Sequence, residues 1–243
     1  MSFTLPQQSL LAVMLAAGAA AGAAEPNTAA HQAQIDAIVR DISPQRIQAN
    51  IDKLVGFGTR HTMSDTVSDT RGIGAARRWI KSELERCGAG KLQVAFDGHL
   101  HPVDRRIARP TEIVNVVATL PGTQAESRER MYVVSGHYDS RNTDVDDATH
   151  DAPGANDDAS GTAAVIELAC VMARYQFDAT LVFMAVAAEE QGLYGSTDFA
   201  EKAKQKKLNI AGMFTNDIIG SSTNEEGKRD NGQVRLFAEG IPA

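Results

Sequence analysis

The chain has only two cysteines in 243 residues, Cys87 and Cys170. No histidine and asparagine pattern beside either one suggests a cysteine nucleophile, so thiol-based hydrolysis is not expected. An exported chain could pair the two residues in a disulfide, but sequence alone cannot establish the geometry that such a bond needs. We expect buried free thiols, because cysteine packs like a small apolar side chain.

Positive charge is also in short supply. Lysine and arginine total 24 residues against 31 aspartates and glutamates, which gives a formal net charge of −7. This balance argues against a nucleic-acid-binding surface. The chain has no internal repeat, and its only low-complexity stretch is an alanine-rich N-terminus. A hydrophobic content of 43% is ordinary for a globular protein, and the length suits one large α/β domain or two small ones.

The N-terminal apolar run, Leu10 to Ala24, is too short and too rich in alanine and glycine for a stable membrane span. No lysine or arginine precedes it, but small residues suit cleavage before Glu25. We predict a signal peptide over 1–24, an N-terminal extension over 25–42 and one main domain over 43–243. The expected location is secreted or periplasmic, by bacterial export. A disordered alanine-rich tail is the alternative.

Apolar periodicity predicts an α/β fold with an open, mostly parallel (mixed) sheet and helices on both faces. Helices are expected at 33–40, 44–55, 74–86, 160–174 and 195–207, with Ser43 and Ser160 as N-caps. Strands are expected at 92–96, 113–120, 131–135, 180–187, 210–215 and 234–238. Strands and helices alternate from 131 to 215, which favours parallel pairing of the strands there.

Three short stretches place histidine or carboxylates where a strand ends or a helix begins. They are Ser135–Ser140, Pro153–Gly161 and Ala187–Gly192. Open α/β sheets hold their sites at the carboxyl ends of strands, so these stretches should meet at one edge. Asp217 follows a further strand and should join them.

Imidazole nitrogen and carboxylate oxygen are ligands that suit zinc, and one carboxylate can bridge two ions. Asp157, in a glycine-rich loop, is the best bridging candidate. Asp139 is placed to orient the ring of His137. Of the adjacent Glu189 and Glu190, one can bind metal while the other takes a proton, provided that the chain bends there.

Other polar groups have plainer interpretations. The acidic loop around Asp144 and His150 is expected to be solvated rather than a second metal site. His99 and His101 are interpreted as the end of a surface strand without surrounding carboxylates. Arg60 and His61 follow a glycine-rich turn and are expected to pack near the site.

These residues resemble the co-catalytic di-zinc aminopeptidase family (the MH clan of metallopeptidases), which includes bacterial leucyl aminopeptidases and aminopeptidase Y. The resemblance implies a role for each matching position. His137, Asp157 and Asp217 correspond to ligands of the first zinc, with Asp157 bridging, Glu190 to a ligand of the second, Glu189 to the general base and Asp139 to the carboxylate that supports the histidine. It also suggests a cis peptide bond between Asp157 and Asp158.

The implied function is a secreted zinc aminopeptidase that uses two Zn²⁺ ions and a metal-bridged water to hydrolyse peptides with a free N-terminus. A carboxypeptidase or glutaminyl cyclase of the same clan, or a non-catalytic homologue, is the alternative. The family's second zinc takes a histidine well downstream of Asp217, and no histidine follows Asp217 here. We therefore interpret 43–243 as a partial zinc peptidase domain, truncated at its C-terminus, and expect the chain to be weakly active or inactive by itself.

Overall fold

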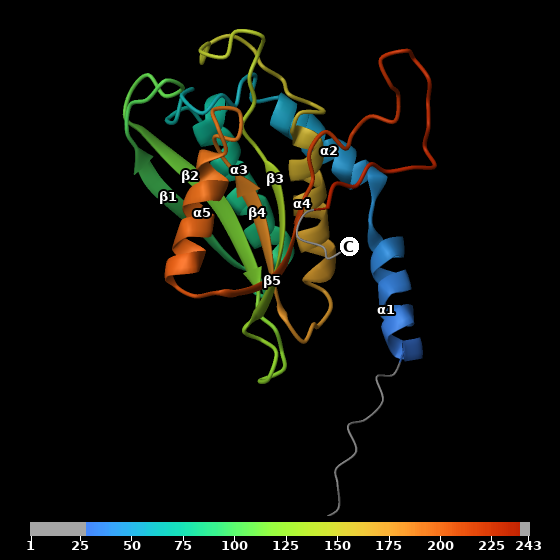
Figure 1. Cartoon of the computed structure of the whole chain (residues 1–243). Coiled ribbons are helices and arrows are strands. Elements are labelled where there is room, and N and C mark those ends of the chain that lie inside the picture. Colours follow the sequence, from blue (N-terminus) through green and yellow to red (C-terminus); the bar gives the residue numbers. More distant parts are fainter. Residues whose placement is uncertain (1–27, 239–243) are drawn as a thin grey trace, which may run out of the picture.

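The computed structural model describes residues 28–238, so the predicted signal peptide over 1–24 lies outside the described residues. Figure 1 shows one sheet with helices packed around it. In chain order the elements are α1 (Thr28–Asp41), α2 (Pro44–Val55), α3 (Gly72–Gly88), β1 (Gln93–His101), β2 (Thr111–Leu120), β3 (Arg130–His137), α4 (Ala159–Met172), β4 (Thr180–Val186), α5 (Tyr194–Gln205) and β5 (Asn209–Thr215).

The five strands form a mixed sheet in the order β1-β2-β4-β3-β5. β3 pairs in parallel with both β4 and β5, while β2 is antiparallel to both β1 and β4. Four strands therefore share one direction and only β2 opposes them. The carboxyl ends of β3, β4 and β5 meet at one edge, at the top of Figure 1. This agrees with the predicted mostly parallel, mixed sheet.

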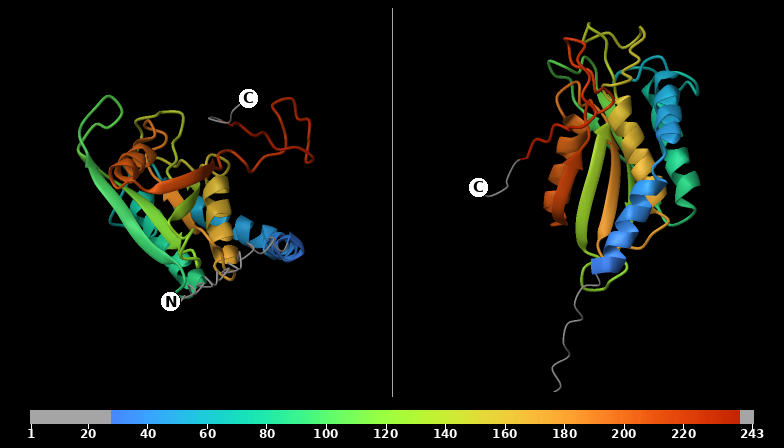
Figure 2. Two further views of the ribbon diagram at one scale, coloured as in Figure 1. Left: turned by 60° about the horizontal axis from the view of Figure 1, so that its bottom comes forward. Right: turned by 90° about the vertical axis from the view of Figure 1, so that its right-hand side faces the viewer.

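Helices cover both faces of the sheet, as predicted. The right-hand view of Figure 2 shows α5 on one side and α2, α3 and α4 on the other. On the larger side, α4 packs on β3 and β4, and α3 packs on β1 and β2. On the smaller side, Val133, Val182, Met184 and Val186 form a second buried cluster against Phe199 of α5. The motif loops begin at the ends of β3 and β4, two central strands that helices cover.

Local sequence explains where several elements begin. Ser43 caps α2 by accepting a hydrogen bond from the backbone N–H of Arg46, and Pro44 occupies the first turn, as predicted. The N-cap of α4 is Asp158 rather than the expected Ser160, because the Asp158 carboxylate accepts the N–H of Gly161. The N-cap thus lies two residues earlier than the serine pattern indicated.

The expectation of free thiols is wrong. Cys87, in the last turn of α3, forms a disulfide with Cys170 in the last turn of α4, and their Cα atoms lie 5.1 Å apart. α3 and α4 pack side by side, which brings together two residues 83 positions apart in sequence. Nothing in the local sequence around either cysteine reports that packing.

Two further expectations fail near the end of the chain. Residues 234–238 form no strand, and Val234, Leu236 and Phe237 are more than 80% exposed. Their alternating pattern has no partner strand among residues 28–238. β5 forms as predicted but is not covered on both faces, since six of its seven residues are exposed. Across the described part of the chain, no helix is both long and apolar enough to cross a membrane.

Candidate metal centre

The ring of His137 lies at the centre of the predicted site, at the carboxyl end of β3. Its side chain is only 3% exposed. Its Nε2 atom faces three carboxylates, which come from the β3–α4 loop, the β4–α5 loop and the segment after β5. The distances from Nε2 are 3.0 Å to Oδ1 of Asp157, 3.8 Å to Oδ1 of Asp217 and 4.0 Å to Oε2 of Glu189. The structure therefore brings these four predicted site residues together at one point.

The other ring nitrogen of His137 is held by Asp139. The closer contact of Nδ1 is the backbone carbonyl of Asp139, at 3.2 Å, and the carboxylate Oδ1 lies at 3.5 Å. Asp139 is fully buried. The expected support of the ring thus comes first from the main chain of Asp139 and only second from its side chain. A ligand histidine commonly has its second nitrogen fixed in this way.

The Asp139 carboxylate has a further task, which the sequence did not reveal. Its Oδ1 accepts the N–H of Glu189 and its Oδ2 accepts the N–H of Glu190, each at 3.2 Å. Ala188 adopts a positive φ of 58° just before them. This is the bend that two adjacent glutamates require. It sends Glu189 towards His137, whereas Oε2 of Glu190 lies 2.5 Å from Nε of Arg141.

Asp158 is the neighbour that sequence reasoning left without a role. One oxygen of Asp158, one of Asp217 and a ring nitrogen of His137 lie within 4.8 Å of one another. However, the Asp158 oxygens already accept the backbone N–H groups of His137 and Gly161, at 3.0 and 2.8 Å. The side chain of Asp157 is 46% exposed and points at Nε2. Asp157 is therefore the better ligand candidate, and Asp158 fixes the backbone of the histidine. The bond between these two residues is cis, as expected.

Asp217 reaches the centre because its loop docks on the start of α4. The backbone N–H of Asn216 donates to the carbonyl of Ser135 (2.8 Å), at the end of β3. The N–H of Gly220 donates to Oδ1 of Asn156 (2.8 Å), in the loop that carries Asp157. These two bonds bracket Asp217 and place it beside the histidine.

The electrostatics of the site favour a bound cation. Burial opposes charging of His137, but the carboxylates of Asp139 and Asp157 outweigh it and raise the pKa of the ring to about 11. The same hydrogen bond to His137 lowers the pKa of Asp157. Burial raises the pKa of Glu189, and it raises that of Asp158 to about 7. Several negatively charged carboxylates thus surround one protonated imidazole. A metal ion bound there could balance their charge.

His99 and His101 lie at the end of β1, as expected, but the expectation that no carboxylates surround them is wrong. Nδ1 of His99 lies 3.2 Å from Asp198, and Nε2 of His101 lies 3.1 Å from Asp104. Lys202 also pairs with Asp198, so an ion-pair network joins His99 of β1 to α5.

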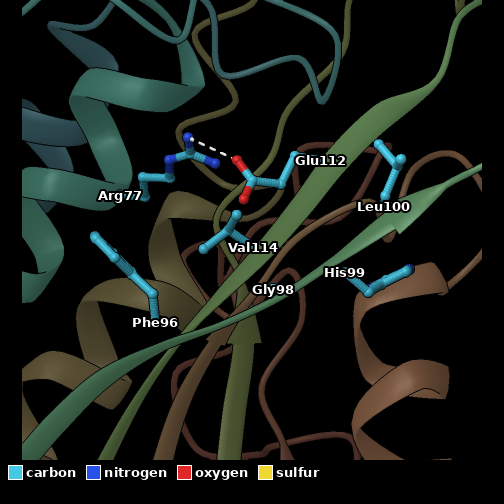
Figure 3. A pocket seen from close by; sticks show the side chains of 7 residues that line it. All are labelled: Arg77, Phe96, Gly98, His99, Leu100, Glu112 and Val114. Atoms are coloured by element: carbon cyan, nitrogen blue, oxygen red, sulfur yellow. Dashed lines mark ion pairs between the residues drawn. The ribbon is translucent and has the colours of Figure 1, made fainter.

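An open groove of about 580 Å³ lies between α3 and the β1–β2 pair, away from the metal centre (Figure 3). Arg77 of α3 crosses it to Glu112 of β2, with 3.6 Å between Nη2 and Oε2. None of the predicted site residues lines this groove. The candidate metal centre therefore lies at the strand ends, outside this groove.

Residues 115–237, which include every predicted site residue, match peptidase family M28. The chain belongs to that family. A probable zinc metalloprotease from Leptosphaeria maculans is 50% identical over 217 residues, covering 88% of this chain and 50% of the relative. The chain spans about half the length of the curated relatives it matches. The predicted resemblance to zinc peptidases is confirmed at the level of the family.

Solved structures support the fold of this M28 chain. The LapA aminopeptidase of Legionella pneumophila matches with a TM-score of 0.59 and 21% identity, over 77% of this chain and 46% of that one. A glutaminyl cyclase from Bacteroides thetaiotaomicron matches with a TM-score of 0.59 and 17% identity, over 75% and 65%. At these identities the likeness shows a shared zinc-exopeptidase-like fold.

Proposed function

We propose that this M28 peptidase is a secreted exopeptidase that removes N-terminal residues from peptides, with zinc held at the His137 centre. One observation carries the proposal. The ends of β3, β4 and β5 and the loops that follow them bring three carboxylates within 4.0 Å of Nε2 of His137. This set of nitrogen and oxygen donors fits zinc.

In this proposal His137, Asp157 and Asp217 would hold the first zinc. Asp157 and Glu190 would hold a second, and Glu190 now pairs with Arg141. When bound, the zinc would polarise the scissile carbonyl and lower the pKa of a water molecule. The residues of the chain position these groups, and Asp139 and Asp158 fix the backbone around them.

Glu189 is the proposed general base. Its pKa is raised by burial, which brings its proton affinity closer to the working range of a base. Its side chain is 31% exposed, so it can reach a water molecule as well as the centre. It would take the proton from the attacking water and then deliver it to the leaving amine.

The disulfide supports the proposed export. Cys87–Cys170 joins two helices of the core, and such structural disulfides are typical of proteins that mature in oxidising compartments. Relatives of the fold include an aminopeptidase and a glutaminyl cyclase. Cyclisation of N-terminal glutamine is therefore the second candidate, because it also acts on a free N-terminus.

The test of this proposal is Glu189→Gln in the full-length protein. We expect at least about a hundredfold loss of turnover on aminoacyl chromogenic substrates, with zinc content unchanged. Glu129→Gln, an exposed change outside the site, is the matched control and should leave turnover intact. Unchanged turnover of Glu189→Gln would remove Glu189 as the base. Cyclisation of glutaminyl peptides without hydrolysis would favour the second candidate.

A further inference from the structure

The Thr59–Thr62 segment supplies no candidate ligand, yet it touches all three motif stretches. Arg60 contacts the loop after β3 and the loop that precedes Asp157. His61 is fully buried, and its Nε2 lies 3.1 Å from the carbonyl of Val145 and 3.3 Å from Nε2 of Gln191, beside the two glutamates. This segment therefore links both ends of the β3–α4 connection to the β4–α5 connection.

Arg60 is the centre of these links, and its side chain is completely buried. Its guanidinium donates to four backbone carbonyls and to no carboxylate. The acceptors, with distances from the donor nitrogens, are Tyr138 (2.7 Å), Leu54 (3.0 Å), Pro153 (2.8 Å) and Gly154 (3.0 Å). The planar fork of arginine fixes the relative positions of these acceptors, which a lysine cannot do.

The backbone of Arg60 completes the connection. Its N–H donates to Oγ of Ser140 (3.0 Å), and its carbonyl accepts the N–H of Ser140 (3.3 Å). The Ser140 hydroxyl then donates to the carbonyl of Ala152 (2.7 Å). Gly154 approaches so closely that an added Cβ would lie 2.9 Å from Nη2 of Arg60. The two ends of the β3–α4 connection are thus joined by the guanidinium of Arg60, and also by Ser140, which Arg60 holds through its backbone.

The charge of Arg60 also acts on the site. Burial lowers its pKa to about 10, and the nearby carboxylates of Asp139, Asp158 and Asp157 oppose that shift. The guanidinium therefore stays protonated at neutral pH. It is a fixed cation beside acids that would repel one another before a metal arrives.

We propose that Arg60 is a positioning residue for the metal centre: its buried guanidinium holds the loops of His137 and Asp157 at the separation that zinc binding requires. This inference rests on the proposed function, since it presumes zinc at His137. It assigns to Arg60 an effect on metal affinity beyond any effect on folding.

The test compares Arg60→Lys with Arg46→Lys in this chain, using zinc alone as the probe. Both changes keep the charge and remove a guanidinium fork, because Arg46 donates twice to the carboxylate of Glu167, away from the centre. Thermal unfolding reports stability, and competition with a chromophoric chelator reports the zinc affinity of the folded chain. We expect Arg60→Lys to weaken zinc binding about 10- to 100-fold, and Arg46→Lys to affect unfolding only.

Wild-type zinc affinity in folded Arg60→Lys would overturn the inference and leave the proposed function intact. Absence of zinc binding by the wild-type chain would contradict both the inference about Arg60 and the proposed function. If Arg60→Lys does not fold, hydrogen exchange on the wild-type chain decides. Zinc should slow exchange over 58–64 as well as over 137–140, but not over 93–97 of β1, because coupling between two sites is reciprocal. Unchanged exchange over 58–64 on zinc binding would contradict the role of Arg60.

Discussion

The two halves of the candidate centre differ in how far the protein has assembled them. Around His137, three carboxylates already lie within 4.0 Å of one ring nitrogen. Glu190, the proposed ligand of the second ion, is paired with Arg141 instead. The first half is built by buried hydrogen bonds from several loops, whereas in the second the Glu190 carboxylate is held by Arg141. Of the two proposed metal positions, one is therefore preorganised in this chain and the other is not.

Among the variants, His137→Ala should cause the largest loss of zinc affinity at the first half. Changes in residues that merely support a ligand typically cost 10- to 100-fold in metal affinity, so loss of the central ligand should cost more than about a hundredfold. Competition with a chromophoric chelator measures the effect. His150→Ala is the control, since His150 lies on the exposed acidic loop. Equal loss in both variants would mean that zinc binds elsewhere.

Low pH should have the second-largest effect on zinc affinity at the His137 half. The pKa of His137 is raised to about 11 without metal, so at neutral pH the ring carries a proton that zinc must displace. Affinity should therefore rise with pH, by about tenfold per unit for one displaced proton, or about a hundredfold from pH 6 to pH 8. Calorimetry in buffers of different ionisation enthalpy would count the released proton. A flat affinity with no proton release would exclude His137 as a ligand.

Asp139→Asn tests whether both halves share one support. Its carboxylate fixes the amides of Glu189 and Glu190, and an amide side chain can accept only one of these two bonds. We expect zinc affinity to fall about 10-fold, within the range for residues that orient ligands. Asp147→Asn is the matched control, because Asp147 likewise accepts two backbone N–H groups but in the acidic loop. Wild-type affinity in Asp139→Asn would show that the bend forms without it.

Arg141→Gln should strengthen binding of the second zinc, because it removes the ion pair that occupies Glu190. Removal of the guanidinium frees Glu190, and partly exposed ion pairs are worth up to about 1 kcal/mol, so a second zinc should bind up to about fivefold more tightly. The affinity of the first zinc should change less. Arg174→Gln, which removes an ion pair with Asp41, serves as the control. A weaker second zinc in Arg141→Gln would indicate that Arg141 supports that position.

The sequence predicted the half of the centre that follows from topology. Parallel strands end at one edge, so His137, Glu189 and Asp217 had to meet once the strands were identified. Local sequence motifs do not show which helices pack together, and for that reason the Cys87–Cys170 bond was not expected. Arg60 escaped notice for a different reason: its acceptors are backbone carbonyls from distant loops, and such acceptors leave no pattern of residue types.

The most direct test is a zinc titration of the wild-type chain, followed by calorimetry and by metal analysis after dialysis. The preorganised His137 half predicts one tightly bound equivalent, and a second that binds more weakly and is lost on dialysis. Two equivalents of equal affinity would contradict the difference between the two halves, and no tight equivalent would contradict the metal centre itself.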